Sequence, residues 1–165
     1  MPITFEFGSP FDLVPKLFRK KQYFGEGLIY IMNKQSCPYD NGALLKQALR
    51  CLADLMMGSS SSSFFPTNDL NLVVDILVRE IENLDSNDRM REDYLVALSL
   101  LLQNSGWKSK GGYRKKNIRT ILHAILDVDL EYDEAVLVTA QKVWDDCHGL
   151  LDVIQRLESS KTLHI

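Results

Sequence analysis

The sequence predicts an all-α protein built from antiparallel helix pairs. Apolar residues recur at spacings of three and four in six segments, and the period-two alternation typical of strands occurs nowhere in the 165 residues. Breaker residues, among them Pro38, Gly42 and Pro66, separate the segments. Because the connections are short, we expect successive helices to turn back on one another and pack in pairs.

The spacing of the helices favours a repeat architecture. The six expected helices cover residues 24–34, 44–57, 69–84, 88–104, 117–126 and 133–157. The odd-numbered helices therefore start near residues 24, 69 and 117. The spacing between these starts is close to the repeat length of HEAT and armadillo units, roughly 40–47 residues. This period predicts an armadillo/HEAT-like α-solenoid fragment. A plain helical bundle is the alternative.

The third and fourth helices have well-defined apolar faces. The third carries its apolar residues on one side, at Leu70, Val73, Val74, Leu77, Ile81 and Leu84, and the fourth at Met90, Tyr94, Leu98, Leu101 and Leu102. Leu77 and Leu98 lie in the middle of these faces, so we expect each to be buried against the other's helix. Thr67 or Asn68 is expected to cap the third helix and Ser86 the fourth.

The last helix permits two interpretations. Its apolar residues alternate spacings of four and three, as in a heptad seam, at Val136, Ala140, Val143, Cys147, Leu150, Ile154 and Leu157. Leu137, Trp144 and Leu151 make the seam wider than a coiled coil requires. A terminal helix packed on its neighbours explains this width better, and dimerisation through the helix is the alternative.

Composition and charge limit the classes of protein. Hydrophobic residues at 45% and charged residues at 25% are typical of a globular domain. A net charge of -3 excludes a strongly basic nucleic-acid-binding protein. No apolar run approaches the roughly 20 residues of a membrane span, and the first residues, MPITFEFGSP, do not form a secretory signal. The three cysteines (Cys37, Cys51 and Cys147) form no CxxC pair, which indicates free thiols and a cytoplasmic location.

The sequence offers no pattern typical of catalysis. Asp145 and His148 could share a helix face, but two exposed ligands make a weak metal site, and Cys147 points elsewhere. His123 interrupts an apolar helix and is expected to be an interior or rim residue. Phosphate-binding loops and nucleophile motifs are absent from the sequence. We therefore expect no enzyme, no catalytic, cofactor or metal site, and no small-molecule substrate.

Two segments stand out as surface features. Residues 58–63 (GSSSSS) are expected to form a flexible linker, with phosphorylation beside the third helix as the alternative. Residues 107–119, here called the basic segment, concentrate positive charge and aromatic rings in a net acidic chain. Its candidate partner-binding residues are Trp107, Lys108, Lys110, Tyr113, Arg114, Lys115, Lys116 and Arg119. Such a segment predicts an acidic partner, which could be a protein, anionic lipid or RNA, or else a solvated turn.

An ordered string of residues also resembles a known family. The string includes FGEGLIYIMNK, LLKQALRCLADLMMG and FFPTNDLNLVVDILVREIENL, followed by Arg91 and Tyr94-Leu95. Over residues 23–107 it is similar to the C-terminal armadillo-like region of the WISH/DIP/SPIN family, which includes the Nck-interacting protein with an SH3 domain and fungal counterparts. The resemblance and the helix pattern together suggest an N-terminal extension (1–22, short or irregular), an armadillo-like helical domain (23–158) and a C-terminal tail (159–165).

The resemblance implies a function. Members of this family bind and activate the actin-related protein 2/3 complex and so nucleate unbranched actin filaments, which implies a cytoplasmic protein of cortical actin structures. The chain has no SH3 domain and no proline-rich linker. We therefore expect a fragment, or a short relative that binds without activating. The alternatives are a generic helical-repeat adaptor that binds a partner helix, and an RNA-binding helical protein that uses the basic segment.

Overall fold

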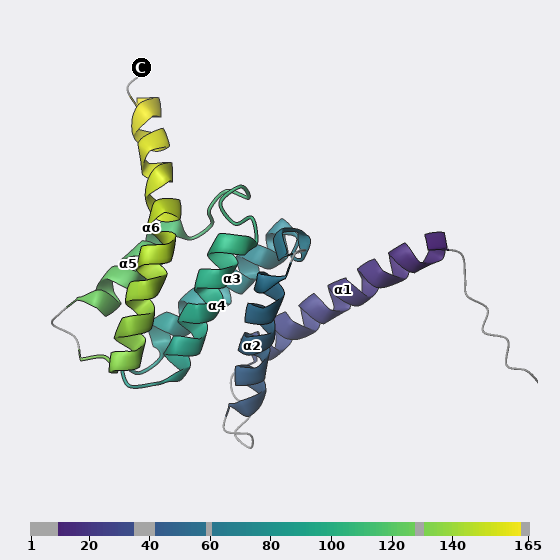
Figure 1. Cartoon of the computed structure of the whole chain (residues 1–165), viewed down its shortest axis with the longest axis horizontal. Helices are drawn as coiled ribbons and strands as arrows, with labels where there is room; N and C mark the ends of the chain where they lie inside the picture. The colour runs from purple at the N-terminus through teal and green to yellow at the C-terminus, as the bar shows by residue number, and fades with distance from the viewer. Residues whose placement is uncertain (1–9, 35–41, 59–60, 128–130, 163–165) are drawn as a thin grey trace, which may run out of the picture.

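The computed structural model describes residues 10–34, 42–58, 61–127 and 131–162, and the side chains of residues 20–34, 42–58, 61–127 and 131–151. These residues form six α-helices and one short 3₁₀ helix, with no strand among them (Figure 1). The elements are α1 (Pro10–Asn33), α2 (Ala43–Met57), η1 (Ser61–Ser63), α3 (Thr67–Asn83), α4 (Met90–Asn104), α5 (Lys115–Leu126) and α6 (Glu134–Thr162). The predicted all-α fold is confirmed.

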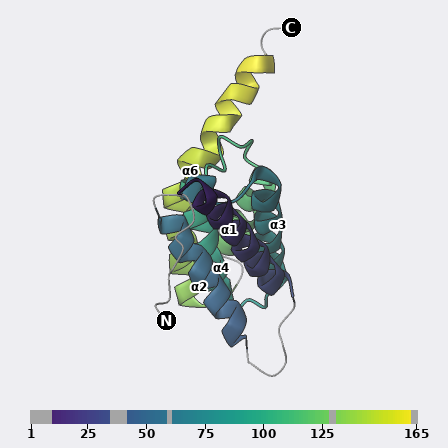
Figure 2. The same ribbon diagram turned by 90° about the vertical axis from the view of Figure 1, so that its right-hand side faces the viewer.

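The helices form two layers. In one layer α4 packs against α2 on one side and α6 on the other, and in the second layer α3 packs against α1 and α5. Each even-numbered helix also contacts the odd-numbered helix that precedes it. Figure 1 shows the three pairs one after another across the molecule, and Figure 2 views them from the end where α1 and α2 lie. The described pairs are also compatible with a layered bundle, so the armadillo-like solenoid stays a prediction.

The central pair, α3 and α4, is buried more completely than the apolar faces predicted from the sequence suggest. Leu77 and Leu98 are buried, as predicted. Ile76 and Val78 on α3 are also buried, although they lie outside the predicted face. Both helices have neighbours on several sides, and a helix that is apolar nearly all round fits such an interior position.

The ends of several helices differ from the predicted positions. α1 begins at Pro10 and not near residue 24, so the helix includes residues 10–22, which were assigned to a short or irregular N-terminal extension. Proline suits a first helical turn because its fixed φ is already helical and it has no amide hydrogen to satisfy. At the other end, α6 continues to Thr162, into the predicted tail. Residues 1–9 and 163–165 lie outside the described part.

The predicted capping residues were also wrong. Pro66 occupies the N-cap position of α3 and no side chain there accepts a hydrogen bond; Thr67 is already helical. Near the start of α4, the carboxylate Oδ1 of Asp88 accepts a bond from the amide of Met90 at 2.9 Å, which replaces the predicted Ser86 cap. The Asp88 carboxylate therefore satisfies one free amide at the start of α4, whereas no side chain does so at the N-cap of α3.

Part of the heptad-like seam of α6 is used within the chain. Val136, Ala140, Val143 and Cys147 are buried, and α6 contacts α4 and α5. The side chains of Ile154 and Leu157 lie outside the described residues, so dimerisation through that end of α6 stays an alternative. No helix of the described residues is both long and apolar enough to cross a bilayer.

Candidate partner-binding surface

The first part of the basic segment is a folded loop held by Trp107. The indole of Trp107 is only 1% exposed, and its Nε1 donates a hydrogen bond to the backbone oxygen of Tyr113 at 2.9 Å. The amide of Gly112 donates to the carbonyl of Trp107 at 3.0 Å, which closes the loop. Gly112 has φ of 62°, a left-handed conformation that suits glycine. The loop therefore folds around its own tryptophan.

Lys110 joins this loop to residues 58–63, here called the serine-rich segment. Its Nζ donates to the carbonyl oxygens of Ser62 at 2.9 Å, Phe65 at 3.1 Å and Ser105 at 3.1 Å. These three bonds match the three donor protons of an ammonium group. Lys110 thus has a structural role that its position in a run of basic residues did not indicate.

Asp75 of α3 holds the end of the loop. Arg114 donates from Nε to Asp75 Oδ1 at 2.7 Å, and the Tyr113 hydroxyl donates to Asp75 Oδ2 at 3.2 Å. The hydrogen bond to Asp75 raises the pKa of Arg114, with a further contribution from Tyr113. Arg114 also has a positive φ of 62°, which is uncommon for a residue with a side chain. These contacts fix the position from which α5 starts.

The predicted site residues therefore differ in how far their side chains are exposed. Trp107 and Lys110 lie against the fold, which corrects their assignment to an exposed binding surface. Lys108 and Lys116 are exposed, Lys115 and Arg119 are half-buried, and Tyr113 and Arg114 are exposed while contacting Asp75. Because α5 begins at Lys115, the last three cations lie on a helix and not in a loop.

The buried tryptophan also weakens the RNA alternative. Stacking of bases requires an accessible aromatic face. Trp107 presents none, and the Tyr113 hydroxyl is directed to Asp75. The basic segment therefore lacks the open pair of aromatic rings on which that alternative depended.

The serine-rich segment is more ordered than the predicted flexible linker. Residues 61–63 form η1, and the Ser61 hydroxyl donates to the carbonyl of Asn104 at 3.0 Å. The carbonyl of Ser63 accepts a bond from Lys21 Nζ at 3.2 Å. Residues 59 and 60 lie outside the described part. The described serines connect α1, α4 and the basic segment.

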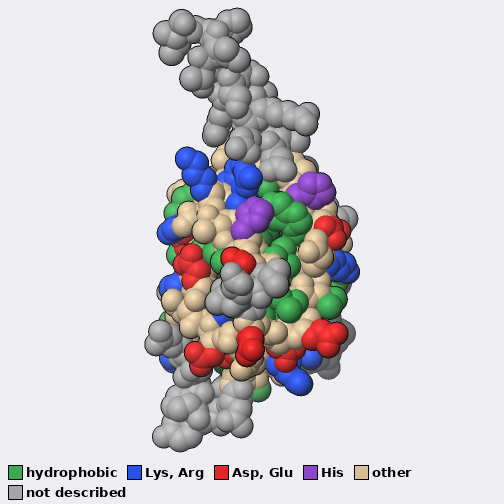
Figure 3. All heavy atoms as spheres, turned by 90° about the vertical axis from the view of Figure 1, so that its left-hand side faces the viewer, with side chains coloured by type: hydrophobic (Ala, Val, Ile, Leu, Met, Phe, Trp, Pro, Cys, Tyr) green, Lys and Arg blue, Asp and Glu red, His purple; other side chains and the backbone are tan. Residues whose placement is uncertain are grey.

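The two described histidines lie near each other on the α5–α6 side, at Trp144. The His123 and Trp144 ring centroids are 4.5 Å apart, and those of Trp144 and His148 are 6.3 Å apart. Figure 3 shows histidines beside a hydrophobic patch on this side of the molecule. His148 Nδ1 faces the carbonyls of Trp144 and Asp145. In the described residues, no group of three His, Cys, Asp or Glu side chains could hold a metal ion.

The two described cysteines have different surroundings. Cys147 is buried, and this burial raises the pKa of its thiol, while a hydrogen bond with Ser99 acts in the opposite direction. Cys51 is half-buried in an apolar groove between α1 and α2, beside the exposed rings of Tyr23 and Phe24. Cys37 lies outside the described residues. A raised pKa keeps the Cys147 thiol protonated and a poor nucleophile at neutral pH.

Comparisons with known proteins agree on one family. The model of the SPIN90/Ldb17 leucine-rich domain matches residues 11–118. Protein dip1 of Schizosaccharomyces pombe is 33% identical over 141 residues, which cover 85% of this chain and 36% of that protein. Protein LDB17 of Saccharomyces cerevisiae is 30% identical over 70 residues, covering 42% of this chain and 14% of that protein. The chain thus spans about a third or less of the length of these relatives.

Proposed function

Because this chain belongs to the SPIN90/Ldb17 leucine-rich domain family, we propose that it is an actin-cytoskeleton regulator that binds the actin-related protein 2/3 complex. The family match over residues 11–118 is the observation that carries this proposal. It confirms the resemblance found in the sequence, and that resemblance implies this partner. The match includes most of α1, all of α2, α3 and α4, and the start of α5, so it involves the packed centre of the fold.

The finer proposal is that binding activates the complex to nucleate unbranched filaments in the cytoplasm at cortical actin structures. A binding protein shifts a conformational equilibrium only by its difference in affinity for the two states. The chain would therefore act as a preformed helical surface that favours the active arrangement of the complex. This role requires no chemical reaction by the chain itself.

A pyrene-actin assay tests this proposal. We expect the purified chain to shorten the lag of polymerisation when actin monomers and the actin-related protein 2/3 complex are present and seed filaments are absent. The matched control omits the complex, and there the chain should leave the lag unchanged. If the chain binds the complex but does not shorten the polymerisation lag, activation is rejected and the binding role stands. Absence of binding would favour a generic adaptor for another partner.

We further propose that the exposed cations of the basic segment contribute to docking. Lys108 and Lys116 are exposed, and the backbone that carries them is anchored by Trp107, Lys110 and Arg114. An anchored backbone loses less conformational entropy on binding, which lowers the free-energy cost of association. Exposed positive charge increases the rate of encounter with an acidic surface. The half-buried Lys115 and Arg119 add positive charge on the same helix.

Reversing both exposed charges tests the docking proposal. We expect Lys108→Glu with Lys116→Glu to weaken binding to the actin-related protein 2/3 complex roughly tenfold at low salt, mainly through a slower on-rate. The effect should shrink at high salt because exposed charges are screened. Surface plasmon resonance at several salt concentrations measures both quantities.

The matched control applies the same change of charge elsewhere. Arg50 and Arg89 are exposed on α2 and immediately before α4, outside the basic segment. Arg50→Glu with Arg89→Glu should therefore slow association less than the reversal at Lys108 and Lys116. Equal effects of the two double variants would show that net charge alone matters, and that the basic segment is no docking surface.

A further inference from the structure

A cavity of about 320 Å³ opens between α4 and α6, in the layer of even-numbered helices. Its apolar part includes Val96 and Leu100 of α4 and Val143 of α6. Val96 is 40% exposed, Leu100 is half-buried and Val143 is buried, so the apolar surface lies partly open to solvent. A cavity of this kind can receive a large apolar side chain from another protein.

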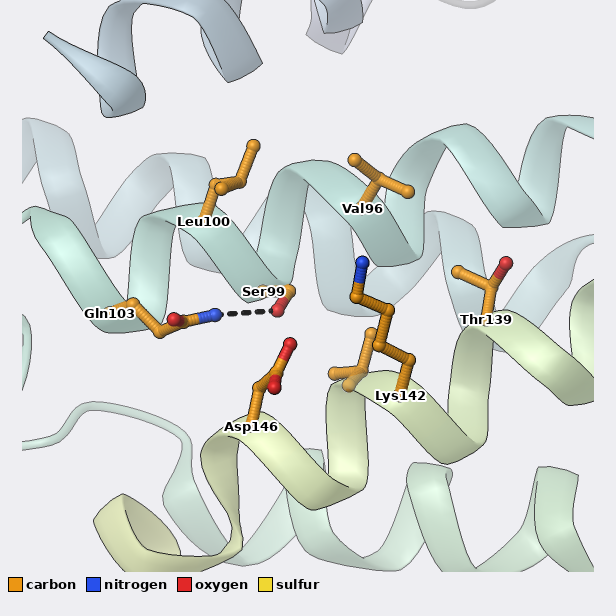
Figure 4. Close-up of a pocket in the computed structure, with 8 residues that line it drawn as sticks. Val96, Ser99, Leu100, Gln103, Thr139, Lys142 and Asp146 are labelled. Carbon is orange, nitrogen blue, oxygen red and sulfur yellow. Dashed lines mark hydrogen bonds between the residues drawn. The ribbon is translucent and has the colours of Figure 1, made fainter.

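Two opposite charges border this apolar surface. Lys142 and Asp146 lie one turn apart on α6, and Figure 4 shows both side chains directed toward α4. Neither forms an ion pair with another described residue. Beside Asp146, the Gln103 side chain donates a 2.9 Å hydrogen bond from Nε2 to the Ser99 hydroxyl. The cavity therefore presents a positive and a negative charge, one turn apart on α6, opposite an apolar surface of α4.

We propose that this cavity is a docking site for an amphipathic helix of the actin-related protein 2/3 complex. The helix would insert one apolar residue beside Val96 and Leu100. It would place an acidic residue near Lys142 and a basic residue, one turn away, near Asp146. Residues three or four apart share one face of a helix, so one helix can supply both charges on one face and the apolar residue on the adjoining face.

Charge complementarity is the reason for choosing this occupant. An apolar side chain alone would leave Lys142 and Asp146 partly desolvated without partners, which costs free energy. A helix with the opposite order of charges compensates both. The site also continues toward the basic segment, because Gln103 lies next to Asn104, where α4 ends and the loop to Lys108 begins. One partner could therefore contact the cavity and the exposed cations together.

The inference rests on the proposed function, and two variants test it. Val96→Arg places a charged side chain at the cavity, and Lys142→Asp with Asp146→Lys exchanges the two charges without changing the net charge. We expect each to weaken binding of the actin-related protein 2/3 complex at least tenfold in a fluorescence-anisotropy assay. The charge exchange involves two exposed residues, so it tests the site even if Val96→Arg disturbs folding.

The control is Val138→Arg, because Val138 is a 64% exposed valine of α6 that does not line the cavity. It should bind within twofold of the parent chain. If the parent binds and the charge exchange also binds within twofold, the cavity is not the docking site, while the proposed function stands. If the parent itself does not bind the complex, both proposals are rejected.

Discussion

Replacing Trp107 by alanine is expected to lower the free energy of unfolding by about 3–5 kcal/mol, the usual cost of removing a buried aromatic side chain. The indole is 1% exposed, and its Nε1 donates to the carbonyl of Tyr113. The substitution removes the packed ring and leaves that carbonyl without its donor. Urea denaturation followed by circular dichroism measures the change.

The control for Trp107 is Tyr113→Phe in the same loop. It removes only the hydroxyl that bonds to Asp75 at an exposed position, so the expected loss is about 1 kcal/mol or less. A loss below about 1 kcal/mol for Trp107→Ala would contradict the interior position of the indole. It would return Trp107 to the set of residues available to a partner.

The second large effect is expected in the central helix pair. Leu77→Ala should cost about 2–5 kcal/mol, because Leu77 is fully buried on α3 and the cavity left behind cannot close completely. Leu98→Ala on α4 should cost a similar amount, since Leu98 is buried as well. Thermal and urea unfolding of the two variants measure these losses.

Leu72 provides the matched control, because it lies on the same helix as Leu77 but is 43% exposed. Leu72→Ala should cost clearly less than Leu77→Ala, since little apolar surface returns to water. The double variant of Leu77 and Leu98 adds a further check. A coupling of about 0.5–3 kcal/mol is expected if the two side chains share one cavity. Equal losses of stability for Leu72→Ala and Leu77→Ala would mean that the wrong face of α3 has been assigned to the core.

Much of the helical framework could be predicted from the sequence because helical periodicity is a local property. The apolar residues of α5 that recur at helical spacing, Ile118, Ile121, Leu122 and Ile125, are all buried. The ends of α2 and α4 fall within two residues of the predicted ends. The start of α1 was missed because Pro10 was not recognised as a first-turn residue. The all-α class and the family follow from the same ordered residue types.

The candidate site was less predictable, because a run of basic residues does not reveal which charges are used inside the fold. Lys108 and Lys110 are two residues apart in the same run. Lys108 is exposed, whereas Lys110 reaches carbonyl oxygens 48 and 45 residues earlier, at Ser62 and Phe65. The α4–α6 cavity had no signal of its own in the sequence, since Val96 and Lys142 come together only when the two helices pack.

Arg91 shows the same division between local pattern and tertiary structure. In the sequence it belongs to the string that carries the family resemblance, but nothing local indicates that its charged side chain is buried. In the fold it is buried, donates from a guanidinium nitrogen to the carbonyl of Leu84, and lies over the Tyr132 ring at 4.9 Å. The sequence by itself determined the helices, most of their buried faces and the family, because these depend on residues within a few turns. Only the tertiary structure decided which polar residues became internal contacts, because their partners lie in distant segments that meet after the helices have packed.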